Sequence, residues 1–214
     1  TPLGRQRRVY HRATLMPPRL IAITGGIGAG KSVVSRVLRC MGYPVLDCDT
    51  LARELMDADA AIKARLKAEI APDVVDDSGV IVRPRLAAIV FADAARLAAL
   101  NAIVHSSVRE AIARWKDDTP GPLAFVETAI LFQSRLNRDV DAEWRVEAPE
   151  AIRIGRVMKR NGLSAEEVKA RIDSQQYTPN ENEVRPTLTV IANDGRNAIL
   201  PQIIQALAEN TPRD

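Results

Sequence analysis

The sequence predicts an α/β fold in which a five-stranded parallel β-sheet is flanked by helices. Short apolar runs typical of buried strands alternate with segments whose apolar residues recur every three or four positions, as in amphipathic helices. Such alternation implies parallel strands that are covered on both faces and bind ligands at their carboxyl ends. A glycine-rich loop at residues 25–32 (GGIGAGKS) follows the first strand, so it is expected at this edge of the sheet.

The first elements surround the glycine-rich loop. A buried strand is predicted at residues 20–24 (LIAIT), directly before the loop. The next helix is predicted from Lys31 to Met41, because Gly42 is a typical helix end. Apolar side chains that share one face of this helix are Val34, Val37, Leu38 and Met41. A short strand at residues 44–46 follows and ends at two acids, Asp47 and Asp49.

Helical patterns dominate residues 50–116. The sequence predicts helices at residues 50–56 and 60–71, a turn at 77–79, and one long helix from Leu86 to Lys116. The buried stripe of the long helix is expected to hold Leu97, Leu100, Val104, Val108 and Ile112. Asn101, His105 and Arg109 lie four residues apart and therefore share a second, polar face.

The last part of the chain completes the sheet. Strands are predicted at residues 123–126, 144–146 and 188–192, and helices at 150–160 and 197–208. Gly162 ends the first of these helices, and Ser164 with Glu167 forms a capping box that opens another helix. Glu127 and Asn193 directly follow two of the strands, so both are expected at the ligand-binding edge.

The charge of the chain is unevenly distributed. Residues 1–19 hold five of the 30 basic residues and no acid, whereas the remainder carries 25 basic and 27 acidic side chains. We interpret residues 1–19 as a basic leader outside the fold, either an upstream extension before a start at Met16 or an organelle-targeting segment. The even charge of the remainder disfavours a nucleic-acid partner. No apolar run approaches the roughly 20 residues of a membrane helix, so no membrane partner is expected.

The two cysteines do not suggest a metal site or a disulfide framework. Cys40 and Cys48 lack the paired spacing of a zinc site, and two cysteines are too few for a disulfide scaffold. We expect both to be reduced thiols, with Cys40 buried on the first helix.

The glycine-rich loop has the pattern G-x-x-x-x-G-K-[ST], which binds the phosphates of a nucleoside triphosphate. Its backbone N–H groups turn inward, Lys31 reaches the β- and γ-phosphates, and the Ser32 hydroxyl ligates Mg²⁺. Lys31 stands where a dinucleotide-binding motif requires its third glycine, which excludes that alternative. We therefore expect a nucleoside triphosphate and Mg²⁺ as cofactors, with the nucleotide held by Gly26, Gly28, Ala29, Gly30, Lys31, Ser32 and Val33.

Two further groups of charged residues allow two interpretations each. Asp47 and Asp49 suit acid–base and magnesium roles, and an aspartate before Thr50 also suits a helix N-cap. Which of the two acids is the base and which holds the metal stays open. Four cations on the helix at 150–160 suit either a solvated face or a lid that neutralises phosphoryl charge: Arg153, Arg156, Lys159 and Arg160.

Several segments together resemble the dephospho-CoA kinase family. They are GGIGAGKS, GYPVLDCDTLARE, RPRLAAIVF, LNAIVH, VETAILFQS, RVMKRNGLSAEEVKARIDSQ and IANDG, within residues 20–196. The resemblance implies transfer of the ATP γ-phosphoryl group to the ribose 3′-hydroxyl of dephospho-CoA. It also implies a phosphate-loop (P-loop) NTPase core at residues 20–59, 117–134 and 186–214, and a helical acceptor-binding region at 60–116. Residues 135–185 would then form part of the core and a helical lid.

The resemblance also implies roles for individual residues. Asp49 matches the proposed catalytic base, Asp47 the neighbouring acid, and Arg156 and Arg160 the arginines of the lid. Catalysis is thus expected from Asp49, Lys31, Arg160 and Asp47, with Ser32 and Asp47 near the metal. Nucleotide binding is extended to Arg156, Asn193 and Gly195, the last two in a loop that cradles adenine. Acceptor binding is expected from Asp49, Arg53, Arg83, His105, Arg109, Glu127, Arg171 and Gln175.

Two positions depart from the family pattern. Ser106 follows His105 where many members have proline, and Gln133 stands in place of a glutamate. Glu127 is expected to supply the missing carboxylate from nearby. The departures concern individual contacts of the site.

Two other functions remain as alternatives to a dephospho-CoA kinase. One is another small-metabolite kinase, such as a nucleoside monophosphate kinase, and the other is a nucleotide-dependent switch without turnover. A dependence of ADP release on the acceptor distinguishes all three. We further expect a cytoplasmic protein that is a monomer or a small homo-oligomer.

Overall fold

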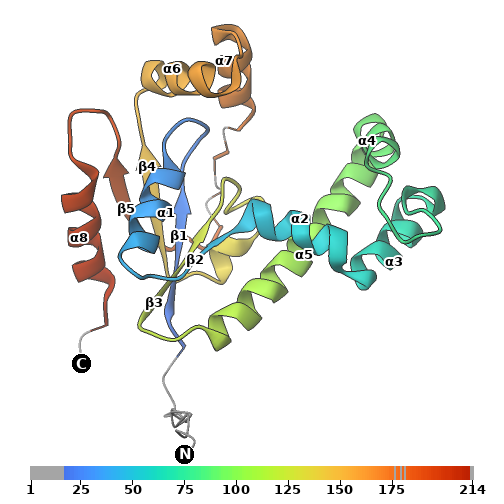
Figure 1. The fold of residues 1–214 in the computed structure, drawn as a ribbon, viewed down its shortest axis with the longest axis horizontal. Helices are drawn as coiled ribbons and strands as arrows, with labels where there is room; N and C mark the ends of the chain where they lie inside the picture. The colour runs from blue at the N-terminus through green and yellow to red at the C-terminus, as the bar shows by residue number, and fades with distance from the viewer. Residues whose placement is uncertain (1–16, 176, 179, 181, 213–214) are drawn as a thin grey trace, which may run out of the picture.

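The structure is a computed structural model that describes residues 17–175, 177, 178, 180 and 182–212 (Figure 1). Its centre is a five-stranded parallel sheet with the order β2-β3-β1-β4-β5. The strands are β1 (Arg19–Thr24), β2 (Val45–Asp47), β3 (Leu123–Glu127), β4 (Ala142–Glu147) and β5 (Thr187–Ala192). This architecture confirms the predicted α/β fold with five parallel strands.

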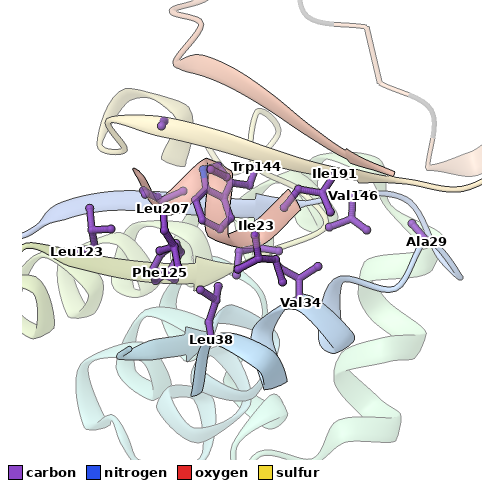
Figure 2. Packing of buried hydrophobic residues seen from close by; sticks show 14 residues of the cluster. Ile23, Ala29, Val34, Leu38, Leu123, Phe125, Trp144, Val146, Ile191 and Leu207 are labelled. Carbon is purple, nitrogen blue, oxygen red and sulfur yellow. The ribbon is translucent and has the colours of Figure 1, made fainter. Parts of the chain in front are cut away.

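One face of the sheet is covered by α1 (Lys31–Cys40) and α8 (Ile199–Asn210). Figure 2 shows their core, in which the buried ring of Trp144 lies beside Phe125 and Ile23. The ring centroids of Phe125 and Trp144 are 5.1 Å apart in an edge-to-face arrangement. Such aromatic contacts add to the free energy gained by burying apolar area, so this layer anchors the strands from which the site is built.

The other face carries α2 (Cys48–Ala58) and part of α5 (Ala94–Asp118), together with residues 131–140, which include a short 3₁₀ helix, Leu136–Arg138. Beyond the sheet these helices continue into a helical extension with its own core (Figure 1). The extension also contains α3 (Ala60–Glu69), a 3₁₀ helix (Pro72–Val74) and α4 (Arg83–Ala92). Within residues 48–118 the chain therefore forms a second packed layer outside the sheet.

The single helix predicted from Leu86 to Lys116 is two helices, and this expectation was wrong. Asp93 separates α4 from α5, and its carboxylate accepts hydrogen bonds from the N–H groups of Ala95 and Arg96. An aspartate that satisfies two free backbone donors favours a helix start over a continuing helix. The apolar periodicity continues through Asp93, so the periodicity alone did not reveal the break.

A helix pair stands above the carboxyl edge of the sheet, at the same end as the phosphate loop (Figure 1). It consists of α6 (Glu150–Asn161) and α7 (Ala165–Ser174). The predicted capping box at Ser164 and Glu167 is confirmed. Val157, Val168 and Ile172 form a small core between the two helices, and Ile27 of the phosphate loop packs against it. The loop and the helix pair are thus in direct apolar contact.

Three smaller expectations need correction. Strand β1 begins at Arg19, whose N–H donates to the carbonyl of Pro122, so Arg19 belongs to the sheet and not to the leader. Residues 1–16 of the predicted leader lie outside the described residues. Met41 is exposed because it caps the end of α1 instead of belonging to its buried face. Cys40, the last residue of α1, is also exposed, whereas Cys48 is buried.

Among the described helices, none is long and apolar enough to cross a membrane.

Candidate active site

The phosphate loop connects β1 to α1 and is held by close neighbours. Gly30 has a φ of 102° and serves as the N-cap of α1, a conformation that L side chains rarely adopt. A Cβ at Gly30 would also overlap the Asn193 side chain, and one at Gly26 would overlap the Arg153 guanidinium. Glycine is therefore required at Gly30, whereas at Gly26 the flexible end of the Arg153 side chain would have to shift.

Lys31 lies at the centre of a cluster of charges. Its Nζ donates a 2.7 Å hydrogen bond to the carbonyl of Gly25. Burial lowers the pKa of Lys31, the carboxylates of Glu127 and Asp49 oppose this shift, and Arg153 and Arg160 add to it. These four groups come from β3, α2 and α6, so the fold brings Arg153 and three predicted site residues from distant parts of the sequence into the field of one ammonium group.

Asp47 and Asp49 differ in their surroundings. Asp47 ends β2 beside Glu127 of β3, and its carboxylate accepts a 2.7 Å hydrogen bond from the N–H of Thr50. Asp47 is thus the N-cap of α2, which begins two residues earlier than predicted, whereas Asp49, the aspartate directly before Thr50, lies in the first turn. Asp49 is exposed in the first turn, and its carboxylate has no hydrogen-bond partner among the described residues. Only Asp49 therefore has both carboxylate oxygens available.

The arginines of α6 hold the main chain of the phosphate loop. Arg153 Nε donates to the carbonyl of Ile27 (2.9 Å), and Arg156 donates to the carbonyls of Gly28 and Ala29 (3.3 Å each). Arg160 is exposed, and among the described residues its side chain bonds only its neighbour Asn161. Arg153 was not among the predicted site residues. Its spacing of three from Arg156 was the available signal, since that spacing places both on one helix face.

Asn193 supports the loop from the other side. Its side chain is buried, donates to the carbonyl of Ala29 (2.7 Å) and accepts from Arg156 (3.1 Å). The polar atoms of this amide are therefore engaged within the protein, whereas Gly195, two residues later, is exposed. Asp194 lies between these two residues. Its carboxylate accepts hydrogen bonds from the N–H groups of Asn197 and Arg196, which lower its pKa.

The predicted acceptor residues are only partly brought together. His105 and Arg109 line a cavity of about 170 Å³ that Asp49 also borders. Arg109 donates to the carbonyl of Ser134 (2.6 Å), and Arg83 forms an exposed ion pair with Asp57 (2.6 Å). Burial and the neighbouring Arg109 lower the pKa of His105, so its imidazole is favoured in the neutral form.

The remaining predicted acceptor residues lie around this region. Arg53 is exposed on α2 and donates to the main-chain carbonyl of Asp49 (3.2 Å). Arg171 is exposed on α7, whereas Gln175, just after it, accepts from the N–H of Ile27 in the phosphate loop (3.0 Å). Gln175 thus contacts the phosphate loop, and its predicted contact with the acceptor stays a prediction.

A larger cavity of about 530 Å³ adjoins Gly25 and Gly26 and contains a buried charge that the sequence analysis missed. Glu143 of β4 is 3% exposed and accepts hydrogen bonds from Thr24 Oγ1 (2.6 Å) and from Arg145 Nε (3.0 Å). Thr24 is the last residue before the phosphate loop. The Glu143 carboxylate therefore fixes the point at which the chain enters the loop.

The donor set suits magnesium more than a metal held by protein ligands alone. Within the described residues, no group of three or more His, Cys, Asp or Glu side chains could hold a metal ion. Mg²⁺ in kinases keeps several waters and takes oxygens from substrate phosphates, so one or two protein oxygens suffice. The exposed Ser32 hydroxyl and the Asp47 carboxylate are oxygen donors of this kind, at the start of α1 and at the end of β2.

Comparisons with known proteins show which family the chain resembles. A family model described as dephospho-CoA kinase matches residues 19–198. The dephospho-CoA kinase of Porphyromonas gingivalis is 37% identical over 87% of this chain and 92% of its own length. That of Thermus thermophilus is 39% identical over 91% of this chain and 93% of its own length.

Solved structures point the same way. The crystal structure of TT1252 from Thermus thermophilus superposes with a TM-score of 0.69 at 38% identity and covers 90% of this chain and 95% of its own. A dephospho-CoA kinase from Campylobacter jejuni shares the fold, with a TM-score of 0.62 at 22% identity over 90% and 96% of the two chains. The family model and the two relatives at 37% and 39% identity show that the chain is an enzyme of the dephospho-CoA kinase family.

Proposed function

We propose that this enzyme transfers the γ-phosphoryl group of ATP to the ribose 3′-hydroxyl of dephospho-CoA, giving coenzyme A and ADP. The observation that carries the proposal is the cluster around Lys31. A phosphate-binding lysine lies in the field of two carboxylates, one of which, Asp49, borders a cavity that is separate from the phosphate loop. A kinase needs this juxtaposition, because the base must lie between the nucleotide and the acceptor.

Positioning and charge stabilisation would supply most of the catalysis. Lys31 would exchange its bond to Gly25 for bonds to the β- and γ-phosphates, and Arg160 would neutralise charge on the transferring group. Asp49 would accept the proton of the 3′-hydroxyl as that oxygen attacks in line. The exposure of Asp49 and Arg160 supports both roles, since neither side chain has to leave a buried partner.

Ser32 and Asp47 would hold Mg²⁺, which, when bound, would neutralise phosphate charge. The cap at the start of α2 occupies one oxygen of Asp47, and the second oxygen is available for the ion or its water. This division assigns the base to Asp49 and the metal to Asp47.

The nucleotide would be held by the backbone of Gly26, Gly28, Ala29 and Gly30, and by residues at the start of α1. Arg156 and the loop of Asn193 and Gly195 would close around the adenosine half of ATP. On the acceptor side we retain Arg53, Arg83, His105, Arg109, Glu127, Arg171 and Gln175 as candidates. Of these, Arg83 would first have to separate from Asp57, and Arg109 would act while bonded to Ser134.

The test is ADP production from ATP and Mg²⁺ with dephospho-CoA, AMP, CMP, adenosine or no acceptor. We expect rapid turnover with dephospho-CoA and coenzyme A as the product by mass spectrometry. Turnover only with another acceptor would replace the substrate but keep a kinase. Absence of acceptor-dependent turnover in folded protein that binds ATP would favour a nucleotide switch and refute the proposal.

The predicted cytoplasmic location, the monomeric or small oligomeric state, the lack of a nucleic-acid partner and the division into core, acceptor-binding region and lid stay predictions.

A further inference from the structure

A small cavity lies beside Asp49, between α2, α5 and the segment after β3. Its volume is about 170 Å³. The walls are mostly aliphatic, with Ala52 from α2, Val104 and Val108 from α5, and Ile130 and Leu136 from the segment after β3. Asp49 also borders it, so the proposed base lies at the edge of an apolar space.

The cavity has the size and polarity for one flat ring system. An apolar cavity of about 150 Å³ in another protein holds benzene. The buried Cys48 side chain also lines the wall and adds to its apolar surface. An anionic ligand would lose its hydration there and would face the Asp49 carboxylate, whereas a neutral aromatic ring would gain apolar contact.

The polar groups in the wall also suit a neutral ligand. Arg109 is the only cation among the described residues that line the cavity, and it is engaged by the carbonyl of Ser134 (2.6 Å) and by Asp139 (3.9 Å). His105 is half-buried, and a neutral imidazole offers one donor and one acceptor. The edge of an adenine ring likewise offers both a donor and acceptors.

We propose that this cavity holds the purine base of the acceptor nucleotide and thereby brings its ribose to Asp49. The inference rests on the proposed function, which supplies an acceptor with an adenosine end. A ribose is bonded directly to its base, so a base within the cavity leaves the ribose at the rim. The cavity thus orients the 3′-hydroxyl toward the carboxylate that accepts its proton, and it selects acceptors by the size of the base.

The first test fills the cavity with Ala52→Leu. We expect the Kd of dephospho-CoA, measured by calorimetry with a non-hydrolysable ATP analogue present, to rise at least about 10-fold, in the range given by steric exclusion from an apolar pocket. The Kd of the ATP analogue should change less than about 2-fold. Ala102→Leu, at an exposed position of α5, is the matched control and should bind both ligands normally. An unchanged affinity of Ala52→Leu for dephospho-CoA would overturn the proposal.

The second test enlarges the ligand instead of the wall. Dephospho-CoA with a 1,N6-etheno bridge carries an extra fused ring, and we expect the unmodified enzyme to bind it at least about 10-fold more weakly than dephospho-CoA. Val104→Ala enlarges the cavity and should restore part of this loss. Equal affinity of the unmodified enzyme for both compounds would contradict a base bound in this cavity, even if Ala52→Leu folded poorly.

The two proposals can fail separately. Normal turnover of dephospho-CoA, without any effect of Ala52→Leu or of the etheno bridge, would refute the base site and leave the activity intact. Absence of turnover would refute the activity, and adenosine binding would then test the cavity alone. Adenosine binding to the unmodified chain that is lost in Ala52→Leu would support a purine site. No adenosine binding, or equal binding to the unmodified chain and to Ala52→Leu, would refute it.

Discussion

Replacement of Asn193 by alanine tests whether this residue supports the phosphate loop or contacts adenine. In the structure its amide makes two buried contacts, one to the carbonyl of Ala29 and one from the guanidinium of Arg156. A neutral hydrogen bond contributes about 0.5–1.5 kcal/mol, and one to a charged group about 1.5–3 kcal/mol. Arg156 keeps its bond to the main-chain carbonyl of residue 193, so part of the second contribution is retained. We therefore expect a loss of about 2–3 kcal/mol in the free energy of unfolding.

Urea denaturation followed by circular dichroism measures this loss, with Asn101→Ala at an exposed position as the control. ATP binding should weaken as well, because the loop loses its support at Ala29. A contact with adenine makes the opposite prediction, namely stability within about 0.5 kcal/mol of the unmodified chain and a reduced preference for ATP over GTP. That result would refute the supporting role.

Three further predictions concern single charges. Asp49→Asn should lower kcat at least about 100-fold with the Kd of ATP nearly unchanged, because only proton acceptance is lost; near-normal kcat would remove Asp49 from the role of base. Glu143→Gln should lower the free energy of unfolding by about 2 kcal/mol, since Arg145 loses a charged partner, and Glu143→Val with Arg145→Val should recover most of it; equal stability of all three chains would contradict this. The pKa of Lys31 is lower in the folded chain than its ordinary value of 10.5. At alkaline pH below 10.5 this lysine therefore holds its proton more fully in the unfolded chain, and its contribution to the free energy of unfolding rises with pH in that range. Lys31→Met should remove that contribution from a pH series of denaturation curves, and identical pH profiles would show that Lys31 makes none.

The strands were predictable because each is a short, buried apolar run, and parallel strands bring their carboxyl ends to one edge. The positions of Lys31, Asp49 and Glu127 near one another follow from this rule, so the centre of the candidate site was accessible from the sequence. Contacts between distant segments were not. Arg153 contacts the main chain of Ile27, 126 residues away, and no local pattern indicates such a contact.

Two other errors arose from local signals that compete. The apolar period of α4 and α5 continues through Asp93, whose capping bonds depend on the conformation that the chain adopts there. Glu143 stands in a short strand between buried residues, and its charge is accommodated only because Thr24 and Arg145 lie on its side of the sheet. In both cases the deciding partner is a specific polar group, which hydrophobic periodicity does not represent.

The contact of Ile27 with Val157, Val168 and Ile172 means that the α6–α7 pair does not close its core by itself. Movement of the pair away from the sheet would expose apolar surface on both the helices and the loop. Slow amide hydrogen exchange in α6, α7 and residues 26–29 should therefore be lost together when this contact opens. Transferred to another protein without the phosphate loop, the α6–α7 pair would lack part of its core and would be less stable.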